Sequence, residues 1–149
     1  MAPGSWLAAL LVSVSCTGSA QDLTPAQTVA RFHQALKQGE IAQVIQYLDP
    51  ALVVFENGQA EYGLAEYREQ HLPYDLDYSR QVQRQIGPQA EHVGGDWAWV
   101  TSQAVVSGEV GSKMVSKQQL ETMILKRGPD GWKIVHIHWS ARALKAETP

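Results

Sequence analysis

Four long stretches with strand-like character follow one another in the second half of the chain, without a helical stretch between them. They span about residues 78–86, 97–107, 115–126 and 132–140, and the turn-forming runs "GGD", "GEVGS" and "RGPDG" separate them. Segments with helical spacing lie before residue 73. This segregation predicts an α+β domain in which helices cover one face of a curved, mostly antiparallel sheet.

The first half of the chain carries three helix signals. In "TPAQTVARFHQALKQGE", Thr24 can cap a helix, Gln27 can complete a capping box, and Gly39 ends the pattern. Its inward stripe comprises Val29, Phe32 and Leu36. The spacing predicts a second helix over residues 41–48 and a third over residues 64–72, which Pro73 is expected to close. Between them, residues 52–56 read as a strand that turns at Asn57-Gly58.

The N-terminus has the pattern of a secretory signal. Residues 6–14 are apolar and uncharged, and the small residues Gly18-Ser19-Ala20 follow them, which predicts cleavage after Ala20. The apolar run is too short to span a bilayer. We therefore expect a signal peptide over residues 1–20, a single domain over residues 21–149, and a periplasmic or secreted protein without a transmembrane segment. A lipoprotein anchored at Cys16 is the alternative.

Cysteine content and charge exclude several classes of function. Cys16 is the single cysteine of the 149 residues, so the processed domain would contain neither a disulfide nor a thiol nucleophile. The net charge is −3 at pH 7, and the basic residues are scattered along the chain. This composition argues against nucleic acid as a partner, because binding it requires a basic face that neutralises phosphates.

The last strand-like stretch, "GWKIVHIHWS", places two histidines two residues apart. Regular alternation would put Trp132, Ile134, His136, His138 and Ser140 on one face, with the two histidines about 6.5 to 7 Å apart at Cα. If "GPDG" is a four-residue turn that pairs Arg127 with Trp132, Glu121 lies directly opposite His138. This register predicts a carboxylate beside an imidazole.

A third imidazole is expected to join this pair. Helical spacing places His71 on the same stripe as Leu64 and Tyr67, facing the sheet. His33 and His92 are interpreted as structural or surface residues. The tryptophans at positions 97, 99, 132 and 139 are interpreted as packing residues that could also line an aromatic pocket.

The stretch "LETMILKRGPDGWKIVHIHWS" resembles nuclear transport factor 2-like proteins, in particular SnoaL-like proteins and the association domain of calcium/calmodulin-dependent protein kinase. Glu121-Thr122, the turn at residues 129–132 and the run from Val135 to His138 with Ser140 carry the resemblance, which extends over about residues 24–142. It implies a cone-shaped, cystatin-like fold: three N-terminal helices on a strongly curved mixed sheet, with a pocket inside.

The resemblance does not specify a function, because the superfamily includes isomerases, cyclases, dehydratases, assembly hubs and carriers without catalysis. It does imply that Asp75 could reach inward at the pocket mouth. It also implies that Glu56 or Glu61 could join the pocket rim.

Three functions remain open on the sequence. The first is an exported pocket that binds a small polar ligand or a transition-metal ion, copper or zinc, through His71, His136, His138 and Glu121. The second is an acid–base enzyme of the isomerase, cyclase or dehydratase type that acts on a hydrophobic small molecule. Glu121 and His138 would exchange the proton in such an enzyme, and Tyr67 would donate to an oxyanion. Whether the chain is an enzyme is left open at this stage.

The third function is a dimerisation or assembly module. The resemblance to the association domain implies pairing through the outer face of the sheet, where Val135, Ile137 and Trp139 are expected to form an apolar stripe. A homodimer is compatible with either of the other two functions.

Overall fold

The first helix begins where its capping residues predict. In the computed structural model, which describes residues 23–145, α1 spans Pro25–Gln38, and both hydrogen bonds of the capping box between Thr24 and Gln27 are present. Gly39 ends the helix with a φ of 76°, a left-handed conformation that glycine adopts without strain. The expected signal peptide, its cleavage site and Cys16 lie outside the described residues.

The elements follow the expected order, with helices before the long strands. The helices are α1, α2 (Ile41–Gln46), α3 (Leu64–Glu66), a π-helical turn (Tyr67–His71) and α4 (Leu72–Gln81). The strands are β1 (Leu48–Glu56), β2 (Gln59–Tyr62), β3 (Val82–Gly94), β4 (Trp97–Val110), β5 (Lys113–Gly128) and β6 (Gly131–Ala143). None of the helices within residues 23–145 is both long enough and apolar enough to span a membrane.

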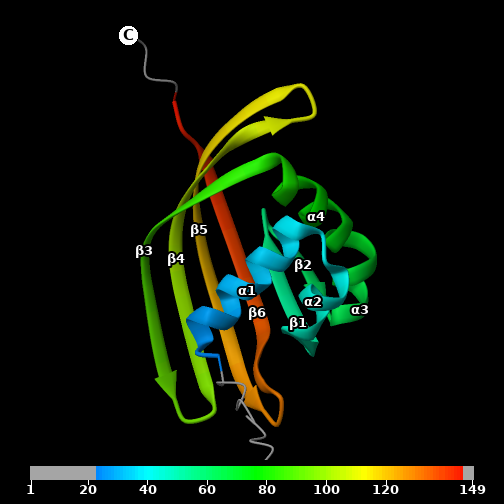
Figure 1. Cartoon of the computed structure of the whole chain (residues 1–149), viewed down its shortest axis with the longest axis vertical. Coiled ribbons are helices and arrows are strands. Elements are labelled where there is room, and N and C mark those ends of the chain that lie inside the picture. Colours follow the sequence, from blue (N-terminus) through cyan, green and yellow to red (C-terminus); the bar gives the residue numbers. More distant parts are fainter. Residues whose placement is uncertain (1–22, 146–149) are drawn as a thin grey trace, which may run out of the picture.

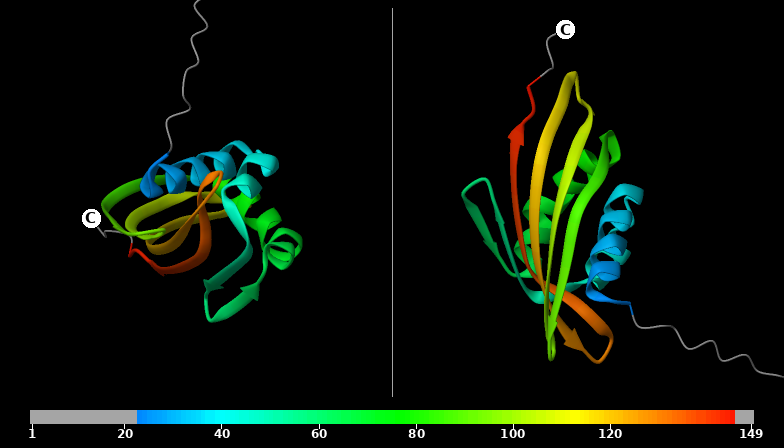
Figure 2. Two further views of the ribbon diagram at one scale, coloured as in Figure 1. Left: turned by 90° about the horizontal axis from the view of Figure 1, so that it is seen from below. Right: turned by 90° about the vertical axis from the view of Figure 1, so that its left-hand side faces the viewer.

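The six strands form one mixed sheet in the order β2-β1-β6-β5-β4-β3. All neighbours are antiparallel except β1 and β6, which run parallel. Figure 1 shows α1 in front of the long strands, and the left view of Figure 2 shows the strong curvature of the sheet beside this helix. The α+β fold class predicted from the sequence is therefore confirmed.

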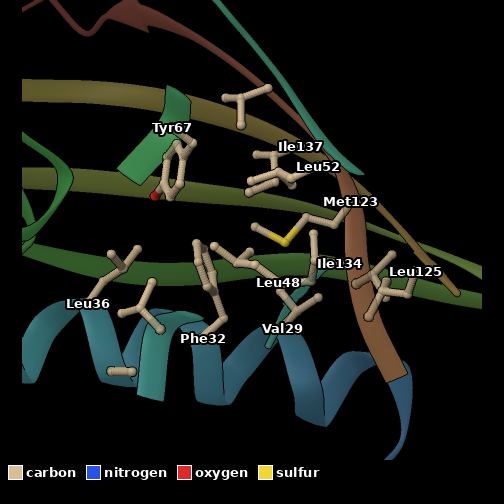
Figure 3. Close-up of a cluster of buried hydrophobic side chains, with 14 of the residues drawn as sticks. Val29, Phe32, Leu36, Leu48, Leu52, Tyr67, Met123, Leu125, Ile134 and Ile137 are labelled. Atoms are coloured by element: carbon tan, nitrogen blue, oxygen red, sulfur yellow. The ribbon is translucent and has the colours of Figure 1, made fainter. Parts of the chain in front are cut away.

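One core lies between α1 and the inner face of the sheet. Val29, Phe32 and Leu36 of α1 point toward the strands, as Figure 3 shows, and all three are buried. The core also contains buried side chains from β1, the π-helical turn, β5 and β6, namely Leu48, Leu52, Tyr67, Met123, Leu125, Ile134 and Ile137. Apolar burial of this kind is the main stabilising contribution in a domain without disulfides.

Two element boundaries differ from the sequence-based expectations. The second helix ends at Gln46, and β1 begins at Leu48 instead of residue 52. Pro73 does not close the third helix: it occupies the first turn of α4, where its missing N–H costs no helical hydrogen bond, and the chain stays helical to Gln81. The strand expected from residue 78 therefore begins at Val82.

A β-bulge in β6 overturns the predicted register beyond Ile134. Arg127 pairs with Trp132, as expected, but Leu125 faces Ile134 while Ile124 faces His136, so that Val135 is an extra residue on β6. Glu121 consequently lies opposite Trp139 and not opposite His138. An insertion of one residue moves all following side chains to the other face of the sheet.

The bulge also overturns the predicted apolar stripe on the outer face. Ile137 and Trp139 are buried on the inner face, at 0% and 5% exposure. His136 and His138 point to the outer face, where both rings lie near the ring of Phe55 on β1. The expectation that these two histidines share a face with Trp132 and Ile134 was therefore wrong.

Candidate functional site

A buried carboxylate is the centre of the first polar cluster. Glu121 lies on β5 between the buried residues Ser102 of β4 and Trp139 of β6, and its side chain is 1% exposed. Trp139 Nε1 donates to Glu121 Oε2 at 2.6 Å, and Ser102 Oγ donates to Oε1 at 3.1 Å. Arg84 on β3 approaches Oε1 to 3.3 Å. These partners satisfy a charge that would be costly to bury alone.

The fourth partner of Glu121 is a histidine on α1. His33 Nε2 lies 2.7 Å from Glu121 Oε2, and the ring packs edge-on against Phe32. Burial by itself would raise the pKa of Glu121, but the adjacent His33, Arg84 and the Trp139 N–H lower it to about 2. Glu121 is thus ionised at neutral pH, and His33 directs an N–H toward it.

The other ring nitrogen of His33 is available for chemistry. Within residues 23–145, His33 makes no hydrogen bond besides the one to Glu121, so Nδ1 has no partner there. An imidazole held by a carboxylate through one nitrogen can accept or deliver a proton at the other. The His33–Glu121 pair has this geometry.

A second polar cluster surrounds His71 at the π-helical turn. His71 Nε2 lies 3.0 Å from Glu56 Oε2 and 3.4 Å from Asp75 Oδ1, while Nδ1 lies 2.9 Å from Glu61 Oε1. The hydroxyl of Tyr67 donates to the other oxygen of Asp75 at 2.7 Å. Two residues of the helical segment, Tyr67 and His71, thus meet two carboxylates of the β1–β2 hairpin and one of α4.

The pKa values of His71 and Tyr67 are both raised in this cluster. Hydrogen bonds to Asp75 and Glu56 raise the pKa of His71 to about 11, although burial acts in the opposite direction. Burial, followed by the charge of Asp75, raises the pKa of Tyr67 well above its usual value. The Tyr67 hydroxyl therefore remains protonated and bound to Asp75.

A cavity of about 390 Å³ connects the two clusters. His33, Arg84 and Trp139 line one part of its wall, and Glu56 and Asp75 line another. Apolar side chains, including Val29, Leu36, Val82, Ile86 and Val106, supply most of the exposed wall, and the polar residues Gln34, Lys37, Ser79, Gln83, Gln89 and Gln119 also line it. Cavities of this size that combine apolar surface with polar groups are typical sites for small organic molecules.

The residues predicted from the sequence divide between the two faces of the sheet. Glu121, Tyr67 and His71 face the interior, but Tyr67 and His71 belong to a different cluster from Glu121. His136 and His138 lie on the outer face, so the expected set of His71, His136, His138 and Glu121 does not converge. Asp75 and Glu56 reach the cavity, as the resemblance implied they could.

Sequence reasoning missed His33, Arg84 and Ser102 as site residues. A signal for His33 existed, because it lies four residues after Val29 and three before Leu36 on the inward stripe of α1. Ser102 alternates with the buried residues Val100 and Ala104 on β4, which marks the inner face. Arg84 had a weaker signal: it shares a strand face with the buried residue Val82, but most of β3 is exposed.

Comparison with known proteins identifies the family. The profile of the SnoaL-like domain family matches residues 26–143. A solved structure from Shewanella frigidimarina, described as a candidate ketosteroid isomerase, is 34% identical, with a TM-score of 0.73, and the match covers 76% of this chain and 91% of that chain. A search of curated proteins gives no match.

Two further solved structures share the fold at lower identity. A candidate dehydratase of the nuclear transport factor 2-like family from Streptomyces avermitilis is 20% identical, with coverage of 81% and 94% and a TM-score of 0.64. The CaMKII hub of S. rosetta is 23% identical, with coverage of 80% and 98% and a TM-score of 0.64. The chain therefore belongs to the SnoaL-like family and shares the fold of nuclear transport factor 2-like proteins.

Proposed function

We propose that this chain is an acid–base enzyme that moves a proton within a hydrophobic small molecule bearing a carbonyl group. One observation carries the proposal: His33 lies on the cavity wall and contacts a buried, ionised carboxylate through Nε2 alone. Glu121 orients the ring and stabilises the imidazolium that forms when Nδ1 accepts a proton. The proposal keeps the small-molecule pocket expected from the sequence, but it assigns the proton-exchange role to His33 instead of His138.

The proposed reaction is an isomerisation through an enolate. His33 Nδ1 takes a proton from the carbon next to the carbonyl, and the carbonyl oxygen acquires the negative charge. Tyr78 lines the cavity, and its hydroxyl would donate a hydrogen bond to that oxygen. The imidazolium then returns the proton to a different carbon, which completes the shift of the double bond.

The substrate class follows from the cavity wall and from one relative. The wall is largely apolar, which favours a ligand with a hydrophobic body. The relative described as a candidate ketosteroid isomerase covers most of this chain at 34% identity. A β,γ-unsaturated ketosteroid is therefore the first substrate to test.

The test is the rate of conversion of that ketosteroid to its conjugated isomer, followed by ultraviolet absorbance. We expect His33→Ala to lower kcat by about 10²- to 10⁴-fold, because it removes the proton acceptor. Glu121→Gln should lower kcat by at least about tenfold, because the carboxylate that orients the ring is lost.

His92→Ala is the matched control, since His92 of β3 stacks on Trp99 of β4 and does not line the cavity. It should retain the wild-type rate. A ketosteroid that binds the wild-type protein without conversion would refute the isomerase assignment. Conversion by His33→Ala at the wild-type rate would refute the role of His33.

We also propose pairing of two copies through the outer face of the sheet. Several large apolar side chains are exposed on that face, namely Phe55, Trp97, Trp99, Val105 and Leu120. Exposed apolar groups of this extent favour a protein interface.

We also propose that the protein is exported and that residues 1–20 are removed. Intact-mass measurement of protein recovered from the periplasm tests this, and a mass that still includes residues 1–20 would contradict it.

A further inference from the structure

The cluster around His71 has the arrangement of a metal site. Glu56, His71 and Asp75 each offer one ligand atom, and these three atoms lie within 4.8 Å of one another. They come from β1, the π-helical turn and α4, so the fold itself assembles the group. We propose that His71 Nε2, Glu56 and Asp75 bind one divalent transition-metal ion such as Zn²⁺.

The spacing of the donor atoms fits coordination. Two ligands at about 2.1 Å from one ion are separated by about 3.0 Å at a right angle and about 3.4 Å at the tetrahedral angle. His71 Nε2 lies 3.0 Å from Glu56 Oε2 and 3.4 Å from Asp75 Oδ1. Both separations from His71 Nε2 are therefore those expected for two ligands of one ion, and the candidate ligand atoms of all three residues lie within 4.8 Å of one another.

Two neighbouring side chains, Glu61 and Tyr67, orient these ligands through hydrogen bonds. Glu61 Oε1 lies 2.9 Å from His71 Nδ1, which orients the ring and leaves Nε2 as the nitrogen at which a metal would replace the proton. Tyr67 donates to Asp75 Oδ2, which leaves Oδ1 directed at His71 Nε2. Carboxylate–histidine–metal arrangements with oriented ligands are typical of metal sites, and a simple ion pair does not require them.

The local charge also favours a cation. Three carboxylates converge on one imidazole, so the group is negative even when His71 is protonated. Oε2 of Glu61 is buried and accepts no hydrogen bond from any group within residues 23–145. A divalent ion bound in place of the His71 Nε2 proton would reduce this excess of negative charge.

The chemistry of the donors limits the choice of metal. One imidazole and two carboxylates are suited to zinc, manganese or iron(II), and the set contains no sulfur ligand for copper(I). The proposal is independent of the proton transfer, because neither His33 nor Glu121 belongs to the cluster. Since Glu56 and Asp75 line the main cavity, an ion held there would lie at its wall.

The experiment is a zinc titration of chelator-treated, tag-free protein by calorimetry, with metal content measured by mass spectrometry. We expect one zinc ion per chain. His71→Ala should weaken binding by more than about 100-fold, and Glu61→Gln by about 10- to 100-fold, because Glu61 acts through the imidazole.

The double variant His136→Ala, His138→Ala is the control, because these two histidines form a pair on the outer face that could itself bind zinc. It should keep wild-type affinity. Loss of zinc in this double variant with retention in His71→Ala would overturn the proposal, as would the absence of stoichiometric binding by the wild-type protein.

X-ray absorption of the zinc-loaded wild-type protein keeps the proposal testable if His71→Ala fails to fold. We expect one imidazole and otherwise oxygen ligands at about 2.0–2.2 Å. Two imidazoles in the first coordination sphere would assign the zinc to the outer-face pair and contradict the proposal.

Discussion

Glu121 is a charged side chain in an interior position, and its partners explain how it stays ionised there. Burial would favour the protonated acid, but Trp139, Ser102, Arg84 and His33 all supply hydrogen bonds or positive charge. The pKa of Glu121 is consequently about 2, against an ordinary value of 4.5. Removing the carboxylate would leave Arg84 and His33 without their shared partner.

The lowered pKa of Glu121 predicts a loss of stability in acid. A group whose pKa is lower in the folded state stabilises the fold above its unfolded pKa, and this contribution disappears as pH falls through the folded pKa. We expect Glu121 to contribute roughly 3 kcal/mol to the free energy of unfolding at pH 7, lost between about pH 4.5 and pH 2.

Urea unfolding of the wild-type protein and Glu121→Gln across this pH range measures the effect. The variant should be less stable at pH 7, and the two stabilities should converge at low pH. Glu109→Gln is the control, because Glu109 is exposed on β4 and the same charge is removed. A stability difference between wild type and Glu121→Gln that stays constant down to pH 2 would contradict the assigned ionisation.

Two elements differ from their sequence pattern for identifiable reasons. The strand character of β6 could be predicted from its periodicity, but the bulge at Val135 could not. Apolar residues and histidines alternate in "IVHIHW", so the sequence alone does not show which set faces the core. Because of that one residue, Trp139 and not His138 contacts Glu121.

The helical segment before β3 shows the same limitation. Pro73 is a strong stop signal in a helix interior, but the π-helical turn over Tyr67–His71 restarts the helix so that Pro73 falls in a first turn. This restart places Asp75 one turn after His71. The Asp75–His71–Glu56 cluster was not predicted because Pro73 was expected to end the helix before Asp75.

The exposed apolar side chains on the outer face of the sheet predict that the protein is a dimer. Trp97, Trp99 and Leu120 are about half exposed there, at 49%, 47% and 48%. Light scattering of the purified protein should give the mass of a dimer at micromolar concentration. Trp99→Glu should produce a monomer, because a charge on that face opposes burial.

Tyr74→Glu is the control for this experiment, because Tyr74 is exposed on α4 and is not part of the outer face of the sheet. It should remain a dimer. A wild-type protein that is monomeric throughout the concentration range would contradict pairing through this face.

At the scale of the whole molecule, the order of elements was predictable and the site was only partly so. The segregation of helices from strands and the inward stripe of α1 follow from periodicity, and both are present. The cavity is different, because its wall combines residues of α1, α4 and five strands that lie far apart in the sequence. Glu121 was identified as a carboxylate paired with an imidazole, but the partner came from α1, and no local pattern links residues 33 and 121.

The central claim is that buried Glu121 holds His33, a residue of the cavity wall, through Nε2, so that Nδ1 is the nitrogen that exchanges a proton with a ligand. Nitrogen chemical shifts of the His33 ring, measured by NMR at a pH where the imidazole is neutral, test it without a substrate. We predict the Nε2–H form in the wild-type protein and loss of this preference in Glu121→Gln. Observation of the Nδ1–H form in the wild-type protein would contradict the account.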